Sequence, residues 1–397
     1  MKKFHFLILI SIMLCVLLAF ALVGCNTGNS LAAPTGLKIE GATLTLSWKE
    51  TADTAYYVIN ISGNGKNENK NARKNTFSLS NLGLPAGDYE VKVKSCTNNK
   101  DYKDSAWSKS IRFTQDADTG LVFRFINNNT EVEVTGLGRA EGNVTIPDTF
   151  RGMPVTSIGE RAFSGKSKLT GIVMSNNITS IGARAFYNCA FIKTAVLSSN
   201  LTSIGDQAFQ SCKLLEGVVK IPQNVTYLGD RAFAYCENIT GVEFNSALET
   251  IGEYAFASCL ALEELVLPNN IVTIKQSAFD SCKSLISVQF GSGLEQIDKY
   301  AFASCDSLES LNFNVGLKSI GEYAFSNCKE LSSAIISNTV ETLGEGAFYM
   351  DAQLNSVTLG SGIKRIGLGA FLDTAIWNNS QEFVYLDNWF LGCKDRE

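Results

Sequence analysis

One spacing constrains this chain more than any other feature: a nine-residue motif returns about every 23 residues through the second half of the sequence. The motif reads Ile/Leu-Gly-x-x-Ala-Phe-x-x-Cys, and Ile251–Cys259 is a clear copy. A fixed period in this range is typical of a solenoid, whose coils bury their apolar residues only by stacking. Its phenylalanines are Phe163, Phe186, Phe209, Phe233, Phe256, Phe279, Phe302, Phe325, Phe348 and Phe371, and every step is 23 residues except the 24 from Phe209 to Phe233.

The apolar positions within one repeat identify the type of solenoid. The spacing after Cys259 is Leu-x-x-Leu-x-Leu, which is typical of leucine-rich repeats. Alternation predicts a short strand with two buried leucines, whereas Ala255, Phe256 and Cys259 have helical spacing. We therefore expect a leucine-rich-repeat solenoid of short parallel strands, with one strand and one tight helical or irregular turn per coil. The apolar positions are Leu262, Leu265, Leu267, Ile271 and Ile274.

The repeat resembles the BspA-type, or treponemal-type, leucine-rich repeat of bacterial surface proteins, over roughly residues 119–391. The resemblance implies adhesion to host matrix proteins or to other cells. It is less specific for the ligand than for the fold, because repeat families use one scaffold for many partners.

The first residues have the pattern of a secretory signal, which we place at residues 1–24. Lys2 and Lys3 precede an apolar run that ends at Leu22-Val23-Gly24-Cys25. This tetrapeptide resembles a bacterial lipobox, which implies that Cys25 is acylated. The chain would then be exported and lipid-anchored to the cell membrane or outer membrane, facing the exterior. An uncleaved membrane helix is the alternative, since the apolar run is just long enough to span a bilayer.

We expect residues 25–32 to form a lipidated linker and residues 33–114 to form a domain of alternating strands. Short alternating strands separated by turn residues predict an antiparallel β-sandwich. Trp48, Trp107 and Tyr89, the last as a tyrosine corner, resemble a fibronectin type III domain. No Arg-Gly-Asp is present. The expected role of this domain is that of a spacer between the membrane and the solenoid. The strands are Leu44–Trp48, Tyr57–Ile61, Phe77–Leu79 and Tyr89–Lys94.

We expect capping elements at both ends of the repeats. Residues 119–157 contain a predicted hairpin of Leu121–Phe125 and Glu131–Val134, which would cover the open end of the solenoid. The repeats occupy residues 158–375. Residues 376–397 are either a C-terminal cap, with an aromatic hairpin from Phe383 to Phe390, or a truncated continuation of the repeats.

Two departures from the repeat carry information. Lys275 and Asp298 replace the motif glycine. Lysine resists a positive φ angle, so close packing explains the glycine elsewhere. The extra residue of the 24-residue copy falls between Leu215 and Val219, where we expect a bulge.

Seven successive repeats carry a cysteine at one position. A metal ladder or stacked disulfides would be alternatives, but no repeat has a second cysteine nearby, and the nine cysteines after Cys25 cannot all pair. We therefore expect buried free thiols. Lys166, Asp351 and Thr374 hold this position in the outer repeats, so it should be buried only in the middle of the stack. The seven are Cys189, Cys212, Cys236, Cys259, Cys282, Cys305 and Cys328.

Catalysis is not expected. The only histidine, His5, lies in the signal, which excludes histidine-dependent catalysis and histidine metal sites in the mature chain. Phosphate-binding, dinucleotide and nucleophile-elbow motifs are absent from the sequence. Removing Lys2 and Lys3 shifts the formal charge from −5 to −7, which disfavours nucleic acid. A glycosidase with paired carboxylates is not excluded by residue type. However, Glu253, Glu322 and Glu345 occupy repeat positions that we expect to be exposed.

Binding therefore remains as the expected function, with no enzyme activity, no cofactor, no metal and no small-molecule substrate. The partner would be an extracellular or host surface protein, with a glycan-binding or purely structural scaffold as the alternative. One outward residue lies between the two core residues of each strand, and solenoids commonly bind partners on this face. These candidate residues, which we call the outward row, are Val173, Val196, Lys220, Glu243, Val266, Gln289, Asn312, Ile335 and Thr358.

Overall fold

The computed structural model describes residues 29–41, 43–80, 82–380 and 383–393. The predicted signal and Cys25 lie outside the described residues. The chain divides into two compact units, Met1–Ala117 and Asp118–Glu397.

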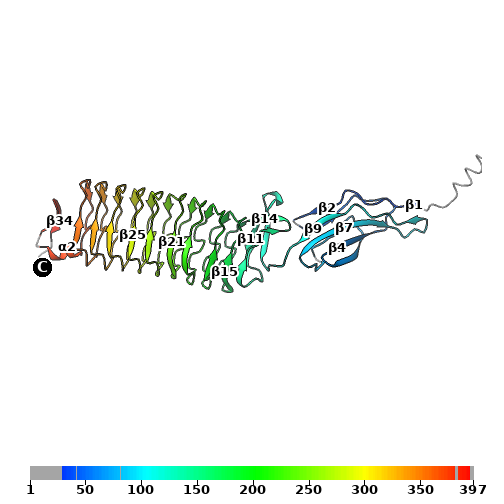
Figure 1. The fold of residues 1–397 in the computed structure, drawn as a ribbon, viewed down its shortest axis with the longest axis horizontal. Helices are drawn as coiled ribbons and strands as arrows, with labels where there is room; N and C mark the ends of the chain where they lie inside the picture. Colours follow the sequence, from blue (N-terminus) through cyan, green and yellow to red (C-terminus); the bar gives the residue numbers. More distant parts are fainter. Residues whose placement is uncertain (1–28, 42, 81, 381–382, 394–397) are drawn as a thin grey trace, which may run out of the picture. The chain divides into compact units, whose positions relative to one another are not determined.

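The first unit contains two antiparallel sheets, in the orders β2-β3-β6 and β5-β4-β7-β9 (Figure 1). They share an apolar core that includes Leu46, Ile59 and Val91, with Trp48 edge-on to Tyr57. The short strands β1 and β8 pair in parallel. The strands are β1 (Asn29–Ser30), β2 (Lys38–Glu40), β3 (Thr45–Ser47), β4 (Tyr56–Gly63), β5 (Lys66–Ala72), β6 (Thr76–Ser78), β7 (Gly87–Cys96), β8 (Tyr102–Lys103) and β9 (Ile111–Gln115).

The second unit begins with the predicted hairpin. Strands β10 and β11 are antiparallel, and β11 then pairs in parallel with β14, with Val132 opposite Val155. The hairpin thus continues one sheet of the solenoid and covers its first edge. The elements are β10 (Val122–Ile126), η1 (Asn127–Asn129), β11 (Glu131–Gly136), β12 (Gly142–Thr145), β13 (Thr149–Phe150) and β14 (Met153–Ile158).

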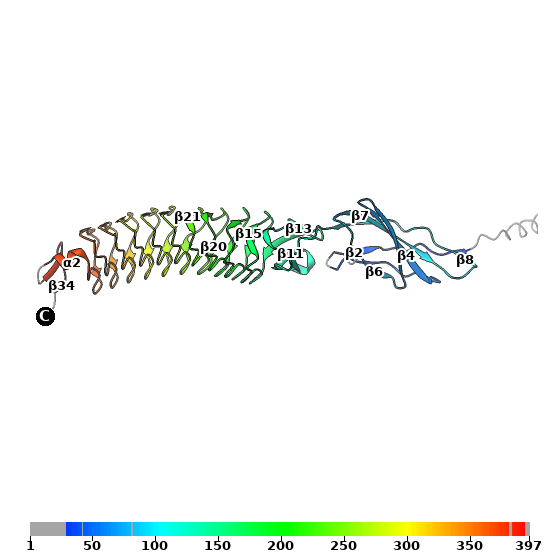
Figure 2. The ribbon, with the colours of Figure 1, turned by 90° about the horizontal axis from the view of Figure 1, so that it is seen from below.

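Each coil of the solenoid contributes two strands, one more than the sequence predicted (Figure 2). The longer strands form the predicted parallel row, in which Leu265 is buried and Val266 is exposed. These strands are β15 (Leu169–Val173), β17 (Thr194–Val196), β19 (Gly217–Lys220), β21 (Ile239–Glu243), β23 (Glu264–Val266), β25 (Ser287–Gln289), β27 (Ser310–Asn312), β29 (Ser333–Ile335) and β31 (Ser356–Thr358).

The second row consists of two-residue strands, each with one buried aliphatic side chain, such as Ile274 in β24. Two residues are too few to show alternation, so the pattern of apolar residues predicted no strand there. These strands are β16 (Ser180–Ile181), β18 (Ser203–Ile204), β20 (Tyr227–Leu228), β22 (Thr250–Ile251), β24 (Thr273–Ile274), β26 (Gln296–Ile297), β28 (Ser319–Ile320), β30 (Thr342–Leu343) and β32 (Arg365–Ile366).

The ten motif phenylalanines form one continuous stack through the core. Neighbouring ring centroids are 4.8–5.7 Å apart, and the ring planes differ by only 3–11°. All ten side chains are buried. Stacking the coils therefore places the same ring above the same ring, which explains the constant period.

The turn that carries each phenylalanine is irregular and contains two residues with left-handed backbone, such as Tyr254 at φ 53° and Ser258 at φ 58°. The phenylalanine N–H donates to the next coil, as Phe256 does to the carbonyl of Ala278 at 2.8 Å, whereas the motif glycine N–H donates to the preceding coil, as Gly205 does to Ile181 at 2.8 Å. The motif glycine has no positive φ, but a Cβ at Gly205 would lie 2.7 Å from the backbone nitrogen of Ala183. Close packing, as expected, explains the glycine.

A register shift falls in the stretch where the extra residue of the 24-residue repeat lies. The pairing of β19 with β21 shifts register between Gly217 and Val218. At the other end, the helix α2 (Ala375–Asn379) follows the last coil, and the aromatic segment forms an antiparallel hairpin of β33 (Phe383–Leu386) and β34 (Trp389–Cys393).

Candidate functional site

The outward row lies on the longer strands, one residue per coil. Its members face one another across the paired strands: Val173 is opposite Val196, Val266 is opposite Gln289, and Asn312 is opposite Ile335. All members are exposed except Val173, which is half-buried. The row therefore forms a surface that a partner can reach along the whole strand face.

Apolar side chains are the most accessible feature of this face. Val196, Val266 and Ile335 are each more than half exposed, at 54%, 56% and 51%. Val218, which the sequence reasoning missed, is 51% exposed on the neighbouring outward position of β19. Exposed apolar area that is not needed for packing is a common feature of contact sites.

A cavity of about 530 Å³ opens on the same face, between β17 and β19. Its walls include Ala195, Val196 and Val218, and its floor reaches the stacked ring of Phe233. A second, shallower hollow of about 650 Å³ adjoins it and shares Val218 with it.

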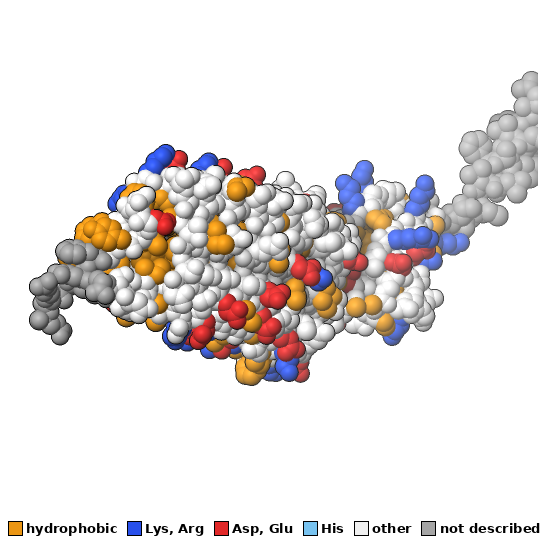
Figure 3. Space-filling view, turned by 60° about the vertical axis from the view of Figure 1, so that its left-hand side comes forward, with side chains coloured by type: hydrophobic (Ala, Val, Ile, Leu, Met, Phe, Trp, Pro, Cys, Tyr) orange, Lys and Arg blue, Asp and Glu red, His pale blue; other side chains and the backbone are white. Residues whose placement is uncertain are grey.

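Charge on the solenoid surface is unevenly distributed. Figure 3 shows acidic side chains gathered on one face, with apolar side chains among them. Among the outward row, Lys220 and Glu243 form an exposed ion pair at 3.0 Å. Exposed pairs of this kind contribute little to stability.

The prediction that the seven repeat cysteines are buried free thiols is confirmed. All seven are unpaired and buried. Each sulfur donates to the carbonyl oxygen of the preceding coil's phenylalanine, over 2.9–3.4 Å. Burial raises the pKa of Cys189 to about 11 and that of Cys259 to about 12. These thiols are therefore neutral and poor nucleophiles.

The expectation that this position is buried only in the middle of the stack is wrong. Lys166, in the first coil, is exposed, but Asp351 and Thr374, in the last two coils, are fully buried. Asp351 accepts a hydrogen bond from the Cys328 N–H, and Thr374 bonds to the Phe371 carbonyl and to the Trp377 N–H. The helix α2 begins directly after Thr374, so the coil is covered rather than frayed.

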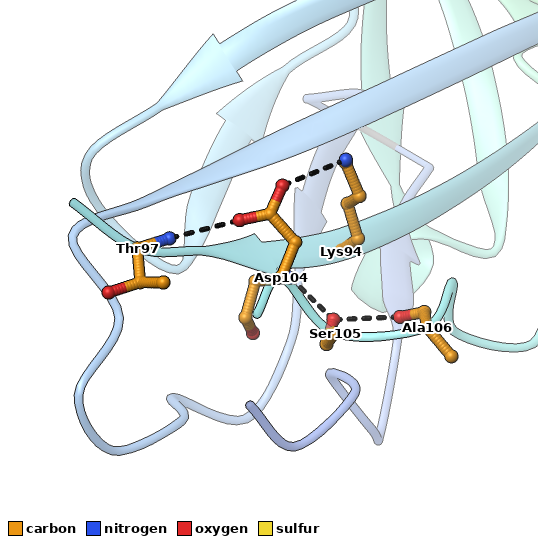
Figure 4. Close-up of polar contacts among 6 residues, drawn as sticks. Lys94, Thr97, Asp104, Ser105 and Ala106 are labelled. Carbon is orange, nitrogen blue, oxygen red and sulfur yellow. Dashed lines mark hydrogen bonds and ion pairs between the residues drawn. The ribbon is translucent and has the colours of Figure 1, made fainter. Parts of the chain in front are cut away.

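The first unit holds a polar cluster around Asp104 (Figure 4). The Asp104 carboxylate accepts hydrogen bonds from the Lys94 ammonium at 3.1 Å and from the Thr97 N–H at 3.2 Å. Ser105 bonds to the Ala106 carbonyl at 2.7 Å. Burial raises the pKa of the adjacent Cys96 thiol to about 11. The cluster fixes a turn, and its thiol is not activated.

Two further findings hold for residues 29–41, 43–80, 82–380 and 383–393. There, no group of three or more Cys, Asp or Glu side chains is placed to hold a metal ion. No helix within those same ranges has the length and apolar character needed to cross a bilayer.

Three solved structures similar to this chain are all of bacterial proteins. A leucine-rich repeat protein from Bacteroides ovatus is 22% identical, with 65% of this chain and 91% of that chain covered and a TM-score of 0.37. The T. pallidum leucine-rich repeat protein is 24% identical, with 55% and 90% covered and a TM-score of 0.41. A leucine-rich cell surface protein from Faecalibacterium prausnitzii is 23% identical, with 65% and 91% covered and a TM-score of 0.32.

No curated protein matches the chain. The family model for the "BspA type Leucine rich repeat region (6 copies)" matches residues 142–263 and 249–376, which together span more than half of the sequence. The match coincides with the stacked coils and their phenylalanine core. This chain therefore belongs to the BspA-type leucine-rich repeat family.

Proposed function

We propose that this protein is a bacterial surface lipoprotein that binds an extracellular or host protein through the strand face of its solenoid. The family is typically non-catalytic. The observation that carries the proposal is the outward row, whose valines and isoleucine stay more than half exposed although their neighbours form the core. An extended face of this kind is what solenoids commonly offer to partners.

The alternative partner is a glycan. Sugars stack on the open faces of aromatic rings, so tyrosines on the motif turns are the relevant side chains. Tyr300 and Tyr323 stack on each other at 5.2 Å, and Tyr349 stands edge-on to Tyr323 at 6.1 Å. These three rings cover part of one another's faces, whereas Tyr235 on another motif turn is 47% exposed. The outward row itself contains no aromatic residue, which favours a protein partner on that face.

The test is a pull-down of extracellular-matrix proteins and, separately, of glycans. The variant Val196→Asp/Val266→Asp/Ile335→Asp should lose the partner without unfolding, because none of these side chains belongs to the core. The control carries the same change at Val122, Val315 and Leu368, which are 47%, 77% and 82% exposed but lie off the outward row. Undiminished capture by a folded first variant would place the binding site elsewhere.

The anchor is the second part of the proposal. Acylation of Cys25 supplies the two lipid chains that stable membrane attachment requires. Cys25→Ser should release the protein into the soluble fraction when cells are fractionated. A variant that remains with the membrane would argue for an uncleaved helix.

The first unit is proposed to be a fibronectin type III-like spacer. Supporting this, its three-stranded and four-stranded antiparallel sheets share one core. The Tyr89 hydroxyl donates to the Pro85 carbonyl at 2.9 Å, as a tyrosine corner does. Tyr89→Phe should lower the stability of this unit by about 1 kcal/mol in chemical denaturation.

A further inference from the structure

The cavity lies between β17 and β19, one of three places where neighbouring strands of the row are not paired; the others are between β21 and β23 and between β25 and β27. Where neighbouring strands are paired, the N–H of the residue after a strand donates to the carbonyl of the last residue of the next strand, as Met174 does to Val196 at 2.9 Å. The bond that would continue this series, from Leu197 to Lys220, is not among the backbone hydrogen bonds of the described residues. The strand on the other side of the cavity, β19, begins at Gly217, within the stretch that carries the extra residue.

Small side chains leave the opening unfilled. Ala195 occupies the strand position at which Leu265 and Leu311 fill the core of other coils. Ala334 also occupies this position, but its strand is paired with both neighbouring strands. Further along the solenoid, Phe290 and Phe313 stand edge-on to rings of the stack, at 6.1 Å and 5.4 Å. Leu197 and Ile221 take their place at the cavity. The ring of Phe233 can therefore line the cavity floor.

The rim of the cavity and of the adjoining hollow is acidic. Glu216 lines the cavity, and Glu263 and Glu264 line the hollow. All three side chains are exposed, and none of them forms an ion pair with another described residue. The one cation at the rim, Lys220, is already paired with Glu243. The site thus combines an apolar hole with three uncompensated carboxylates.

We propose that this cavity is the specificity pocket of the strand face and receives one apolar side chain from a basic, extended segment of a partner protein. The inference rests on the function proposed above and adds the chemistry of the partner. The apolar side chain would replace the missing core volume beside Ala195 and Phe233. Lysines or arginines flanking it would neutralise Glu216, Glu263 and Glu264, which also speeds association at low salt.

The test uses fluorescence anisotropy of the full-length protein with three labelled synthetic peptides in a Gly-Ser frame. The first has a central Phe flanked on each side by two Arg, the second replaces Phe with Ala, and the third replaces every Arg with Glu. We expect the first to bind, the second to bind at least about tenfold more weakly, as expected for loss of a central anchor, and the third not to bind. Equal binding of all three would overturn the proposal.

Two variants locate the peptide. Ala195→Leu fills the cavity with the residue that other coils carry, and should weaken binding of the first peptide at least about tenfold. Glu216→Gln/Glu263→Gln/Glu264→Gln should weaken it at low salt and flatten its salt dependence, because screening acts on exposed charges. The control Glu249→Gln/Glu253→Gln/Glu345→Gln removes the same charge away from the rim and should bind like the unchanged protein.

The outcomes separate this inference from the proposed function. If a matrix protein is captured and Ala195→Leu captures it equally well while folded, the pocket proposal is wrong and strand-face binding stands. If the first peptide binds through the cavity but no matrix protein is captured, the pocket stands and the proposed class of partner is wrong. Binding of the first peptide that survives both rim and cavity variants would overturn the pocket.

Discussion

The carboxylate of Asp351 accepts a hydrogen bond from the backbone N–H of Cys328 at 2.8 Å, while its other oxygen is buried and has no partner among the described residues. Burial raises the pKa of Asp351 well above its ordinary value, and the bond from Cys328 only partly opposes this. The side chain therefore takes up its proton at a higher pH in the folded protein than in the unfolded chain. The neighbouring coils hold neutral side chains at this position, Cys328 and Thr374.

Asp351→Asn should stabilise the protein at neutral pH. Because the folded-state pKa is the higher one, the contribution of Asp351 to stability is greatest below its unfolded pKa and declines as pH rises toward the folded value. Asparagine keeps the acceptor and does not ionise. We expect a Tm higher by roughly 2–4 °C at pH 7, the shift that about 1 kcal/mol causes in a unit of this size, and a smaller gain near pH 4. A gain that does not change with pH, or one matched by Glu249→Gln at the surface, would contradict this account.

The repeat thiols should be silent in the native protein. In a chain without residues 1–25, a chromogenic thiol reagent at pH 8 should react promptly with the exposed Cys393 alone, because the other eight thiols are buried. After unfolding in guanidinium without reductant, all nine should react. Cys393→Ser should remove the prompt signal. A count below nine in the unfolded chain would mean that some thiols are paired.

The position of a phenylalanine in the stack should set the cost of removing it. Phe256 stacks between Phe233 and Phe279, whereas Phe371 has only one neighbour in the stack. Phe256→Ala should cost about 3 to 5 kcal/mol in denaturant unfolding, and Phe371→Ala less. Phe191→Ala is the matched control, since that ring is 51% exposed. Equal, small losses at all three sites would show that the stack does not carry stability.

The motif glycine should resist even one added methyl group. At Gly205, the new Cβ would lie 2.7–2.9 Å from backbone atoms of the preceding coil, so Gly205→Ala should cost about 1–3 kcal/mol. Lys275 already carries a Cβ at the same repeat position, and Lys275→Ala should change stability by less than about 0.5 kcal/mol. Thermal unfolding compares the two, and a harmless Gly205→Ala would remove the packing explanation.

Some features of this molecule could be predicted from spacing because spacing alone produces them. The ring stack needs only a constant period, and the bulge at Gly217 needs only one extra residue. The outward position of Val266 follows from strand alternation between two leucines. These relationships are local, and the same residue positions produce them in every repeat.

Other features depend on neighbours that the repeat pattern does not encode. The burial of Asp351 follows from the cover supplied by the next coil and by α2, whereas an end-of-stack argument predicts exposure. The cavity arises because Ala195 and Leu197 are smaller than the leucine and phenylalanine that some other coils carry at these positions, and because the strands separate there. Each of these residues is unremarkable by itself, so only the assembled coils reveal the hollow.

The repeated hydrogen bonds between motif turns have a consequence for how such a gene can change. Each motif phenylalanine from Phe163 to Phe348 donates its N–H to the alanine carbonyl of the next coil, as Phe186 does to Ala208 and Phe302 to Ala324, both at 2.7 Å. An in-frame duplication or deletion of one whole repeat therefore joins a donor edge to the same acceptor edge as before. Recombination between repeats can therefore lengthen or shorten the protein by single coils, because the new neighbouring coils form the same hydrogen bonds as the old ones.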